Sequence, residues 1–406
     1  MEDLTVGNSS LTRRDLWVMR AYYFFLVGGG GFVAPFLNLF FTRQNLDGFQ
    51  IGVIVAVGSV IGLVAAPAWT RWSAQSRRPL RLLQISLVLM AVASVGLSQQ
   101  RLFLWLMFFY AVRVLVGAGV TPLSDAMALR VTRLLDAGYG SVRVWGSFGW
   151  AIIVLSAGWL NDHVSIEAGF FGFAVALVLG ALLLSRLNST AVTAGPGTIA
   201  AGARAGFRQV AQRMWKDRSL VGLGLMLVII GIGGIGVGQF ENVYLSQLGA
   251  TDSLIGVASM VGSVVEIPGM LWADHMVRQH RPAGILLASL AMSALLRLLV
   301  FSFPSVFLII AVKAVWGMSF SLYTVALIKF IGERTHSHET ATALAIFTVT
   351  LPSIINITGT PLAGLAFDRL GAHWLYLVSV LGYVLGVVIL KSAGLEPGIV
   401  DTREPG

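Results

Sequence analysis

The chain has 406 residues, of which 56% are hydrophobic and only 12% are charged, and its mean hydropathy is +0.81. Such a composition excludes a soluble globular protein and indicates a membrane protein. The net charge of +9 would suggest nucleic acid in a soluble chain. In a membrane protein it reflects basic loops on one side, so we expect no nucleic-acid partner. The absence of cysteine excludes disulfide frameworks and thiolate metal sites, and we expect no cofactor and no metal ion.

Apolar runs of about 20 residues or more recur along nearly the whole chain, which is the length that a bilayer core requires. Segments this long and apolar satisfy their backbone only as helices, so strands are excluded as spanning elements. The first run is too long for a cleavable signal. The pattern predicts an all-α membrane protein with twelve transmembrane helices around a central cavity. Their expected ranges are 15–41, 48–70, 79–98, 102–130, 141–161, 167–187, 219–246, 252–275, 282–302, 305–331, 339–367 and 373–394.

One long polar segment interrupts this series between the sixth and seventh spans. It begins rich in Ser, Thr, Ala and Gly and becomes basic toward its end. We expect it to start flexibly and to end in an amphipathic helix around Phe207 to Trp215. The chain therefore divides into an N-terminal six-helix half (1–187), a cytoplasmic connector (188–218) and a C-terminal six-helix half (219–406).

Basic residues are distributed unequally between the loops. With the N-terminus inside, the opposite loops hold little beyond Arg43, Arg101 and Arg369. This asymmetry predicts a multi-pass protein of the cytoplasmic membrane with both termini in the cytoplasm. Twelve spans in two halves are typical of an alternating-access transporter. The basic residues of the inside loops are Arg13, Arg14, Arg71, Arg77, Arg78, Arg81, Arg130, Arg133, Arg204, Arg208, Arg213, Lys216, Arg218, Arg278, Arg281, Lys329 and Arg334.

An acid and a base stand in two neighbouring spans of the first half, Asp125 and Arg143, joined by a short turn at Asp136 to Gly140. Asp125 lies roughly 13 Å from that turn and Arg143 roughly 6 Å, at 1.5 Å per residue. The long arginine side chain can cover the difference. Charges in a membrane helix are costly unless they are paired or face water, which favours a functional site in a cavity. The alternative is a salt bridge that only fixes two helices.

Trp150 stands seven residues after Arg143 and therefore on the same helix face, with Gly146 and Gly149 nearby. Glycines at these positions let another helix or a ligand come close. An indole can stack on a sugar or aromatic ring, a guanidinium can donate two hydrogen bonds, and the Asp125 carboxylate can accept from hydroxyls. The alternative for Trp150 is a packing or interfacial role.

The second half embeds four charges in spans seven to ten: Glu241, Glu266, Arg297 and Lys313. We expect two ion pairs, Glu241 with Lys313 and Glu266 with Arg297, or the exchanged partners. Embedded carboxylates are also what a proton-coupled carrier needs, because burial moves their pKa toward the working range. The hypothesis is that Glu266 or Asp125 carries the coupling proton.

The residues of spans four and five carry a family resemblance. The run Pro122-Leu-Ser-Asp125, followed by Tyr139-Gly-Ser-Val-Arg143-Val-Trp-Gly-Ser, resembles the branch of the major facilitator superfamily that holds lactose permease and the 3-phenylpropionate permeases. In lactose permease the matching positions are a glutamate and an arginine that bind the galactoside, with a tryptophan one face along. The resemblance implies that Asp125, Arg143 and Trp150 bind the solute.

In the second half the resemblance is to the phenylpropionate-type members, whose acid and arginine match Glu266 in Val-Val-Glu-Ile-Pro and Arg297. The chain also departs from lactose permease, which has a histidine at the position of Trp316 and a glutamate at that of Ser319. Its proton relay is therefore not carried over. The superfamily also has a loop signature after span two, normally glycine with an acid and basic residues. In this chain Ala74 stands at the position of the acid.

Together these observations predict a secondary active transporter that takes up a small organic solute with protons, the solute being a sugar, a nucleoside or an aromatic acid. One alternative is an exporter of drug-like compounds with the same fold. Another is a non-transport membrane protein, an enzyme or receptor, although no catalytic constellation is visible. The expected partners are the solute, the proton and the lipid bilayer, and we expect a monomer.

Arg113 sits mid-span and either lines the cavity or pairs with backbone carbonyls. The candidate substrate-binding residues are Asp125, Arg143, Trp150, Arg113, Lys313 and Trp316, and those for proton coupling or charge pairing are Asp125, Glu241, Glu266 and Arg297.

Overall fold

A computed structural model describes residues 11–76, 78–187, 207–336 and 339–393. All regular secondary structure in these ranges is helical. They contain 12 helical stretches that are long and apolar enough to cross a membrane, so the predicted all-α fold of twelve membrane spans is confirmed. The stretches are Arg13–Arg43, Gly48–Ser73, Pro79–Ser98, Phe103–Leu134, Gly140–His163, Ile166–Leu184, Arg218–Gln247, Asp252–Gln279, Pro282–Ser302, Val306–Gly332, Thr340–Leu370 and Ala372–Ser392.

The chain forms two compact units. Unit 1 comprises Met1–Leu37 and Ile61–Ile199, and unit 2 comprises Asn38–Val60 and Ala200–Gly406. The division therefore falls after the first residue of α2 (Leu37–Arg43) and within α3 (Gly48–Gln75), whose first part belongs to unit 2 although it precedes most of unit 1 in the sequence.

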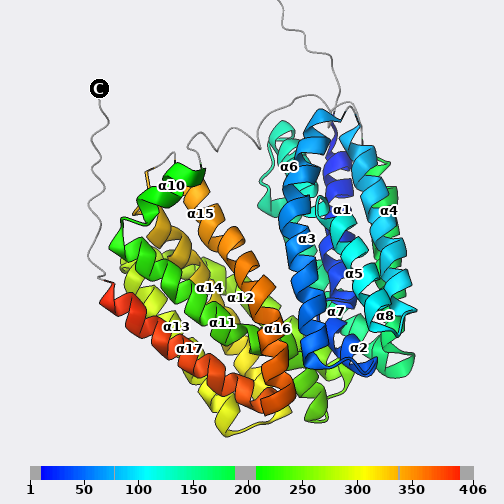
Figure 1. The fold of residues 1–406 in the computed structure, drawn as a ribbon. Coiled ribbons are helices and arrows are strands. Elements are labelled where there is room, and N and C mark those ends of the chain that lie inside the picture. The colour runs from blue at the N-terminus through cyan, green and yellow to red at the C-terminus, as the bar shows by residue number, and fades with distance from the viewer. Residues whose placement is uncertain (1–10, 77, 188–206, 337–338, 394–406) are drawn as a thin grey trace, which may run out of the picture. The chain divides into compact units, whose positions relative to one another are not determined.

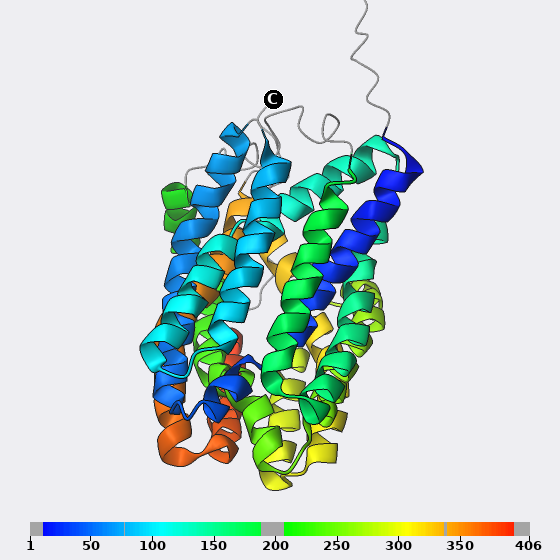
Figure 2. The same cartoon turned by 90° about the vertical axis from the view of Figure 1, so that its right-hand side faces the viewer.

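In unit 1, α1 packs along α7 and α8, and α4 packs along α5 and α8, as both ribbon views show (Figures 1 and 2). Long apolar sequences make these helices stable in a bilayer, and proline at the first position starts α4 without losing a hydrogen bond. The elements of unit 1, besides the end of α3, are α1 (Arg13–Gly29), η1 (Gly30–Phe32), α4 (Pro79–Ser98), α5 (Phe103–Gly117), α6 (Val120–Leu134), α7 (Gly140–His163) and α8 (Ile166–Leu184).

Glycines allow α1 and α7 to touch at backbone distance. A Cβ atom at Gly28 would lie only 2.6 Å from the carbonyl carbon of Gly149, and one at Gly149 would meet the carbonyl oxygen of Phe24. A Cβ atom at Gly31 would lie 3.0 Å from the backbone nitrogen of Val154. Small residues bring membrane helices together in this way. The glycine run of the first span and Gly149 of the fifth therefore serve helix packing.

In unit 2, α11 packs along α17 and α12 along α14, while α13 contacts both α14 and α17 (Figure 1). The short helix α10 lies where the sequence predicts an amphipathic end to the connector, whereas the expected flexible part of the connector, 188–206, lies outside the described residues. The elements of unit 2, besides the start of α3, are α2 (Leu37–Arg43), α10 (Phe207–Met214), α11 (Arg218–Gln247), α12 (Asp252–Gln279), α13 (Pro282–Ser302), α14 (Val306–Gly332), α15 (Thr340–Ala345), η2 (Ile346–Thr350), α16 (Leu351–Leu370) and α17 (Ala372–Ser392).

Within unit 2 the first turn of α3 is held by α16. The Asp368 carboxylate accepts hydrogen bonds from the backbone nitrogens of Gly48 at 2.6 Å and Phe49 at 2.9 Å. A carboxylate there satisfies two free N–H groups and opposes the positive end of the helix dipole. Nearby, Arg43 forms a two-point ion pair with the buried Asp252, with N–O distances of 2.9 and 2.6 Å.

The span from α15 to α16 is interrupted by η2, a π-helical turn. Pro352, just after this turn, has no N–H group, and its ring would collide with the Thr348 carbonyl in a regular α-helix. Widening the turn relieves that clash, which is a physical reason for a π segment at this place.

Candidate functional site

In unit 1 the Asp125 carboxylate on α6 is held by two tyrosine hydroxyls. Tyr23 of α1 donates to its Oδ1 atom at 2.6 Å, and Tyr139, at the start of α7, donates to the same atom at 2.8 Å. Next to it, the hydroxyls of Tyr22 and Ser124 share a hydrogen bond of 2.6 Å. Burial and the bond to Asp125 raise the pKa of Tyr139 above its ordinary value, so this hydroxyl remains a donor at neutral pH.

Arg143 does not pair with Asp125. No ion pair joins these two side chains in the part of the chain that the structure describes, and Arg143 is exposed. The expected pair is therefore corrected: two neutral hydroxyl donors, from α1 and the α6–α7 turn, bind one oxygen of the carboxylate. Helix spacing allowed the arginine to reach the acid, but it did not reveal that α1 brings Tyr23 closer.

Trp150 and Arg113 have buried ring or guanidinium nitrogens. The Trp150 ring lies beside Gly30, where a Cβ atom would be 3.3 Å from it, and its Nε1 atom has no hydrogen-bond partner among the described residues. The Arg113 guanidinium lies 5.4 Å from the centre of the Tyr110 ring, a cation–π contact, and its Nε atom also has no hydrogen-bond partner there. Both side chains thus retain an unused donor.

In unit 2 the predicted pair of Glu241 and Lys313 is present. Their Oε2 and Nζ atoms lie 2.7 Å apart, and both side chains are mostly buried. Tyr376 of α17 donates to the other Glu241 oxygen at 3.0 Å, and Lys313 also donates to the Asn242 side chain at 3.2 Å. One carboxylate of α11 therefore links α14 and α17 through charged and neutral donors.

The second expected pair, Glu266 with Arg297, is not formed. Arg297 of α13 is only 8% exposed, yet no ion pair involves it among the described residues. Its Nη1 atom has one long hydrogen bond to the Ser293 carbonyl, 3.4 Å, and its guanidinium carbon lies 4.4 Å from the centre of the Tyr383 ring. Its Nε atom is buried without a partner there. This arrangement replaces the acid with an aromatic face and a helix carbonyl.

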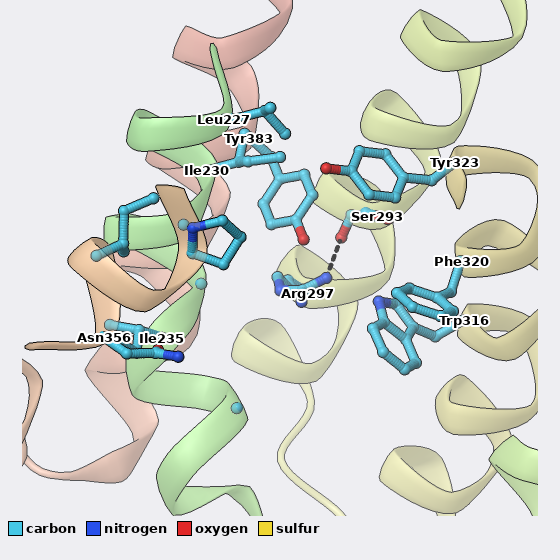
Figure 3. A pocket seen from close by; sticks show the side chains of 15 residues that line it. Leu227, Ile230, Ile235, Ser293, Arg297, Trp316, Phe320, Tyr323, Asn356 and Tyr383 are labelled. Atoms are coloured by element: carbon cyan, nitrogen blue, oxygen red, sulfur yellow. Dashed lines mark hydrogen bonds between the residues drawn. The ribbon is translucent and has the colours of Figure 1, made fainter. Parts of the chain in front are cut away.

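Arg297 lines a cavity of about 310 Å³ that lies wholly within unit 2 (Figure 3). The rings of Trp316 and Phe320 are stacked, with centres 5.2 Å apart and an interplanar angle of 28°. Tyr383 lies on the other side of the guanidinium, and the figure shows its hydroxyl directed toward Arg297. The cavity therefore combines one cation with aromatic walls.

A second, more polar cavity of about 180 Å³ adjoins it and shares Gly238, Arg297 and Trp316 as lining residues. Glu241, Glu266, Lys313 and Tyr376 also line this second cavity. Four of the predicted site residues of the second half, together with Trp316, therefore gather around adjoining spaces. In the described ranges, no group of three His, Asp or Glu side chains is placed to hold a metal ion.

Several site residues were not predicted from the sequence. Tyr23, Tyr376 and Tyr383 touch the predicted charges, but each comes from a helix distant in sequence from its partner. Tyrosines are common in membrane proteins, and no local spacing links these three to Asp125, Glu241 or Arg297. Tyr139 did offer a signal, because it stands four residues before Arg143 at the start of a span.

Twelve apolar spans and cavities lined by embedded charges define a multi-pass membrane protein of the transporter kind. Residues 16–378 match the model of the MFS_1 like family, so the chain belongs to that family of major facilitator transporters. It is 26% identical over 378 residues to a maltose permease of Geobacillus stearothermophilus, covering 92% of this chain and 93% of the relative. It is 24% identical to the uncharacterized transporter YwbF of Bacillus subtilis (strain 168), covering 94% of each chain.

Solved structures share the fold. The nucleoside transporter NupG superposes with a TM-score of 0.76 at 12% identity, covering 94% of this chain and 98% of that one. A bacterial homologue of the human lysosomal transporter Spinster gives 0.71 at 14% identity, covering 95% and 98%.

Proposed function

We propose that this protein is a secondary active transporter that carries a small organic solute into the cell together with protons, by alternating access. The observation that carries the proposal is the gathering of Glu241, Glu266, Arg297 and Lys313 around two adjoining cavities of unit 2. Charged side chains inside a membrane protein cost free energy, and where they occur they mark substrate and ion pathways.

The similarity to a maltose permease and to the fold of a nucleoside transporter supports a sugar or a nucleoside as the solute, and the resemblance to the 3-phenylpropionate permeases supports an aromatic acid. The sequence motif at Asp125 and Arg143 supports placement in the branch that holds lactose permease and the 3-phenylpropionate permeases. In this proposal Asp125, Arg143, Trp150 and Arg113 bind the solute in unit 1, and Lys313 and Trp316 do so in unit 2. The basic inside loops support a cytoplasmic-membrane location with both termini in the cytoplasm.

Proton coupling is assigned to an embedded carboxylate, Glu266 or Asp125. The test is accumulation of radiolabelled solute in proteoliposomes with an imposed inward proton gradient. We expect Glu266→Gln or Asp125→Asn to abolish accumulation above equilibrium while leaving exchange of internal for external solute intact. If both variants still accumulate solute, neither carboxylate carries the proton and this assignment fails.

The same vesicles separate uptake from export. An importer coupled to protons accumulates solute when the outside is more acidic, whereas a drug exporter of the same fold moves compounds against the proton flux. Accumulation only under the reversed gradient would overturn the proposal of uptake. An absence of any gradient-driven flux for all three solute classes would overturn transport of these solutes.

A further inference from the structure

Arg297 is a buried cation without an acidic partner. The residue is 8% exposed, and in the described part of the chain its side chain has one long hydrogen bond, to the Ser293 carbonyl, and one cation–π contact, with Tyr383. A buried guanidinium with unused donors costs free energy, which a bound anion recovers by supplying charge and acceptors. Two carboxylates line the adjoining cavity with Arg297. Glu241 already accepts from Lys313 and Tyr376, and no ion pair joins Glu266 to Arg297 among the described residues.

The aromatic walls around Arg297 favour an anion that also carries a ring. Trp316 and Phe320 form a stacked pair on one side, and Tyr323 and Tyr383 complete an aromatic lining (Figure 3). Aromatic side chains favour a flat ring in offset or edge contact. A volume of about 310 Å³ is at the small end of ligand sites, which run from roughly 300 to 1,000 Å³.

Asn356 supplies a neutral polar group to the same cavity. Asn356 is on α16 and lies across the cavity from Arg297 of α13 (Figure 3). Its side chain has no hydrogen-bond partner in the described ranges. An amide can donate to a second carboxylate oxygen or to a ring substituent. The cavity therefore offers one charged donor, one neutral donor and aromatic walls.

We propose that this cavity binds a small organic carboxylate that carries a flat ring, with the carboxylate on Arg297 and the ring against Trp316. The inference rests on the proposed transport function and names its substrate class. Glu266 lines the adjoining cavity together with Arg297, so a proton taken up there would balance the charge of the bound anion. The neutral sugars and nucleosides then become poor ligands of this cavity.

The test is equilibrium binding to the purified full-length protein, measured by calorimetry, with probes that differ in one property. Benzoate and benzamide differ in charge, benzoate and cyclohexanecarboxylate differ in ring flatness, and uridine and maltose are neutral. We expect benzoate to bind most tightly and cyclohexanecarboxylate more weakly. Arg297→Gln should weaken benzoate binding by about 10- to 100-fold, the usual effect of losing a hydrogen-bonded charge.

Three variants guard against misfolding as the cause. Trp316→Ala should weaken benzoate more than cyclohexanecarboxylate, Arg297→Lys should restore part of the affinity, and the exposed Arg278→Gln should change nothing. The proposal is overturned if benzamide binds as well as benzoate or if Arg297→Gln leaves benzoate binding unchanged. It is equally overturned if only uridine or maltose binds, or if none of the probes binds.

Flux separates this inference from the proposed function. If benzoate binds through Arg297 but is not moved across proteoliposome membranes, the site stands and the transport assignment fails for this ligand class. If uridine or maltose is transported and Arg297→Gln has no effect, the transporter stands and the carboxylate site is wrong.

Discussion

At the scale of single residues, the most direct feature to test is the pair of hydroxyls of Tyr23 and Tyr139 that bind Asp125, which we call the tyrosine clamp. Tyr23→Phe removes a 2.6 Å hydrogen bond to the carboxylate and leaves the ring in place. Hydrogen bonds to charged groups contribute about 1.5–3 kcal/mol, so we expect the free energy of unfolding in detergent to fall by about that amount. Asp125→Asn, which keeps an acceptor oxygen, should cost less. An unchanged stability in Tyr23→Phe would mean that the bond does not stabilise the fold.

Tyr139 gives this clamp a pH dependence. Its folded pKa is raised, by burial and then by the bond to Asp125, above an unfolded value of about 10. The stabilisation is therefore complete below that unfolded pKa and is lost as pH rises through the folded value. Unfolding measured between neutral and strongly alkaline pH should show a decline that Tyr139→Phe reduces. A decline of the same size in the variant would assign it to other groups.

The Glu241–Lys313 pair should respond as a unit. Both partners are mostly buried, so Lys313→Met leaves an uncompensated carboxylate and should cost about 3 kcal/mol of stability. Combining it with Glu241→Met should recover most of that loss, because both charges are then gone. A double-mutant cycle measured by chemical unfolding gives the coupling energy. Additive losses would show that the two charges act independently.

Residue-level inference from the sequence worked where charge and spacing were enough. Embedded charges mark a site because they are costly in lipid, and complementary signs on neighbouring spans predicted Glu241 with Lys313. The same reasoning did not give the partners of Asp125 and Arg297. Neutral tyrosines from distant helices replace the expected ions there, and the sequence has no local signal for which helix faces which.

At the scale of elements, the contact of α1 with α7 depends on the absence of side chains. Gly28→Val should prevent folding or sharply reduce the yield of monodisperse protein, because the new Cβ would lie 2.6 Å from the Gly149 backbone, which cannot give way. Gly140→Ala, at the start of α7, has no atom within 4 Å of its new Cβ and is the matched control. Size-exclusion profiles check both variants. A normal profile for Gly28→Val would contradict this packing.

The start of α3 offers a second test at this scale. Asp368→Asn removes the negative charge that two backbone N–H groups share. Loss of a charged cap at a helix N-terminus costs about 1 kcal/mol. Hydrogen exchange should report faster exchange at Gly48 and Phe49 in the variant, with Asp274→Asn, whose acid lies in an exposed i,i+4 pair with Arg278, as the control. Equal exchange in all three proteins would show that the cap contributes nothing.

The ranges of the twelve spans followed from hydropathy because each lipid-exposed turn must be apolar. Hydropathy did not predict that Asn38–Val60 would group with the second unit. That grouping depends on tertiary contacts such as those of Asp368 and Arg43. Hydropathy averaged over a window of sequence contains no information about such contacts.

At the scale of the whole molecule, the orientation in the membrane can be checked because the chain has no cysteine. Single cysteines at Gln99 and Gly138, both exposed positions, provide labelling sites in loops predicted to lie on opposite sides. The positive-inside pattern predicts that an impermeant maleimide labels Gln99→Cys in intact cells and Gly138→Cys only after permeabilisation. The reverse pattern would invert the predicted topology.

The wide turn at η2 has a consequence for how this span tolerates change in length. A π turn holds one residue more than an α turn, so deleting one residue there, such as the exposed Val349, leaves the number of residues that an unbroken α-helix needs. Because the wide turn already takes up the extra residue, α15 and α16 would keep nearly their present angular relation, and Thr342 and Ala343, now buried, would stay buried. The unbroken helix would instead bring the Pro352 ring against the carbonyl four residues before it. The loss of a residue here would therefore leave the helix faces in place and act on the backbone at Pro352.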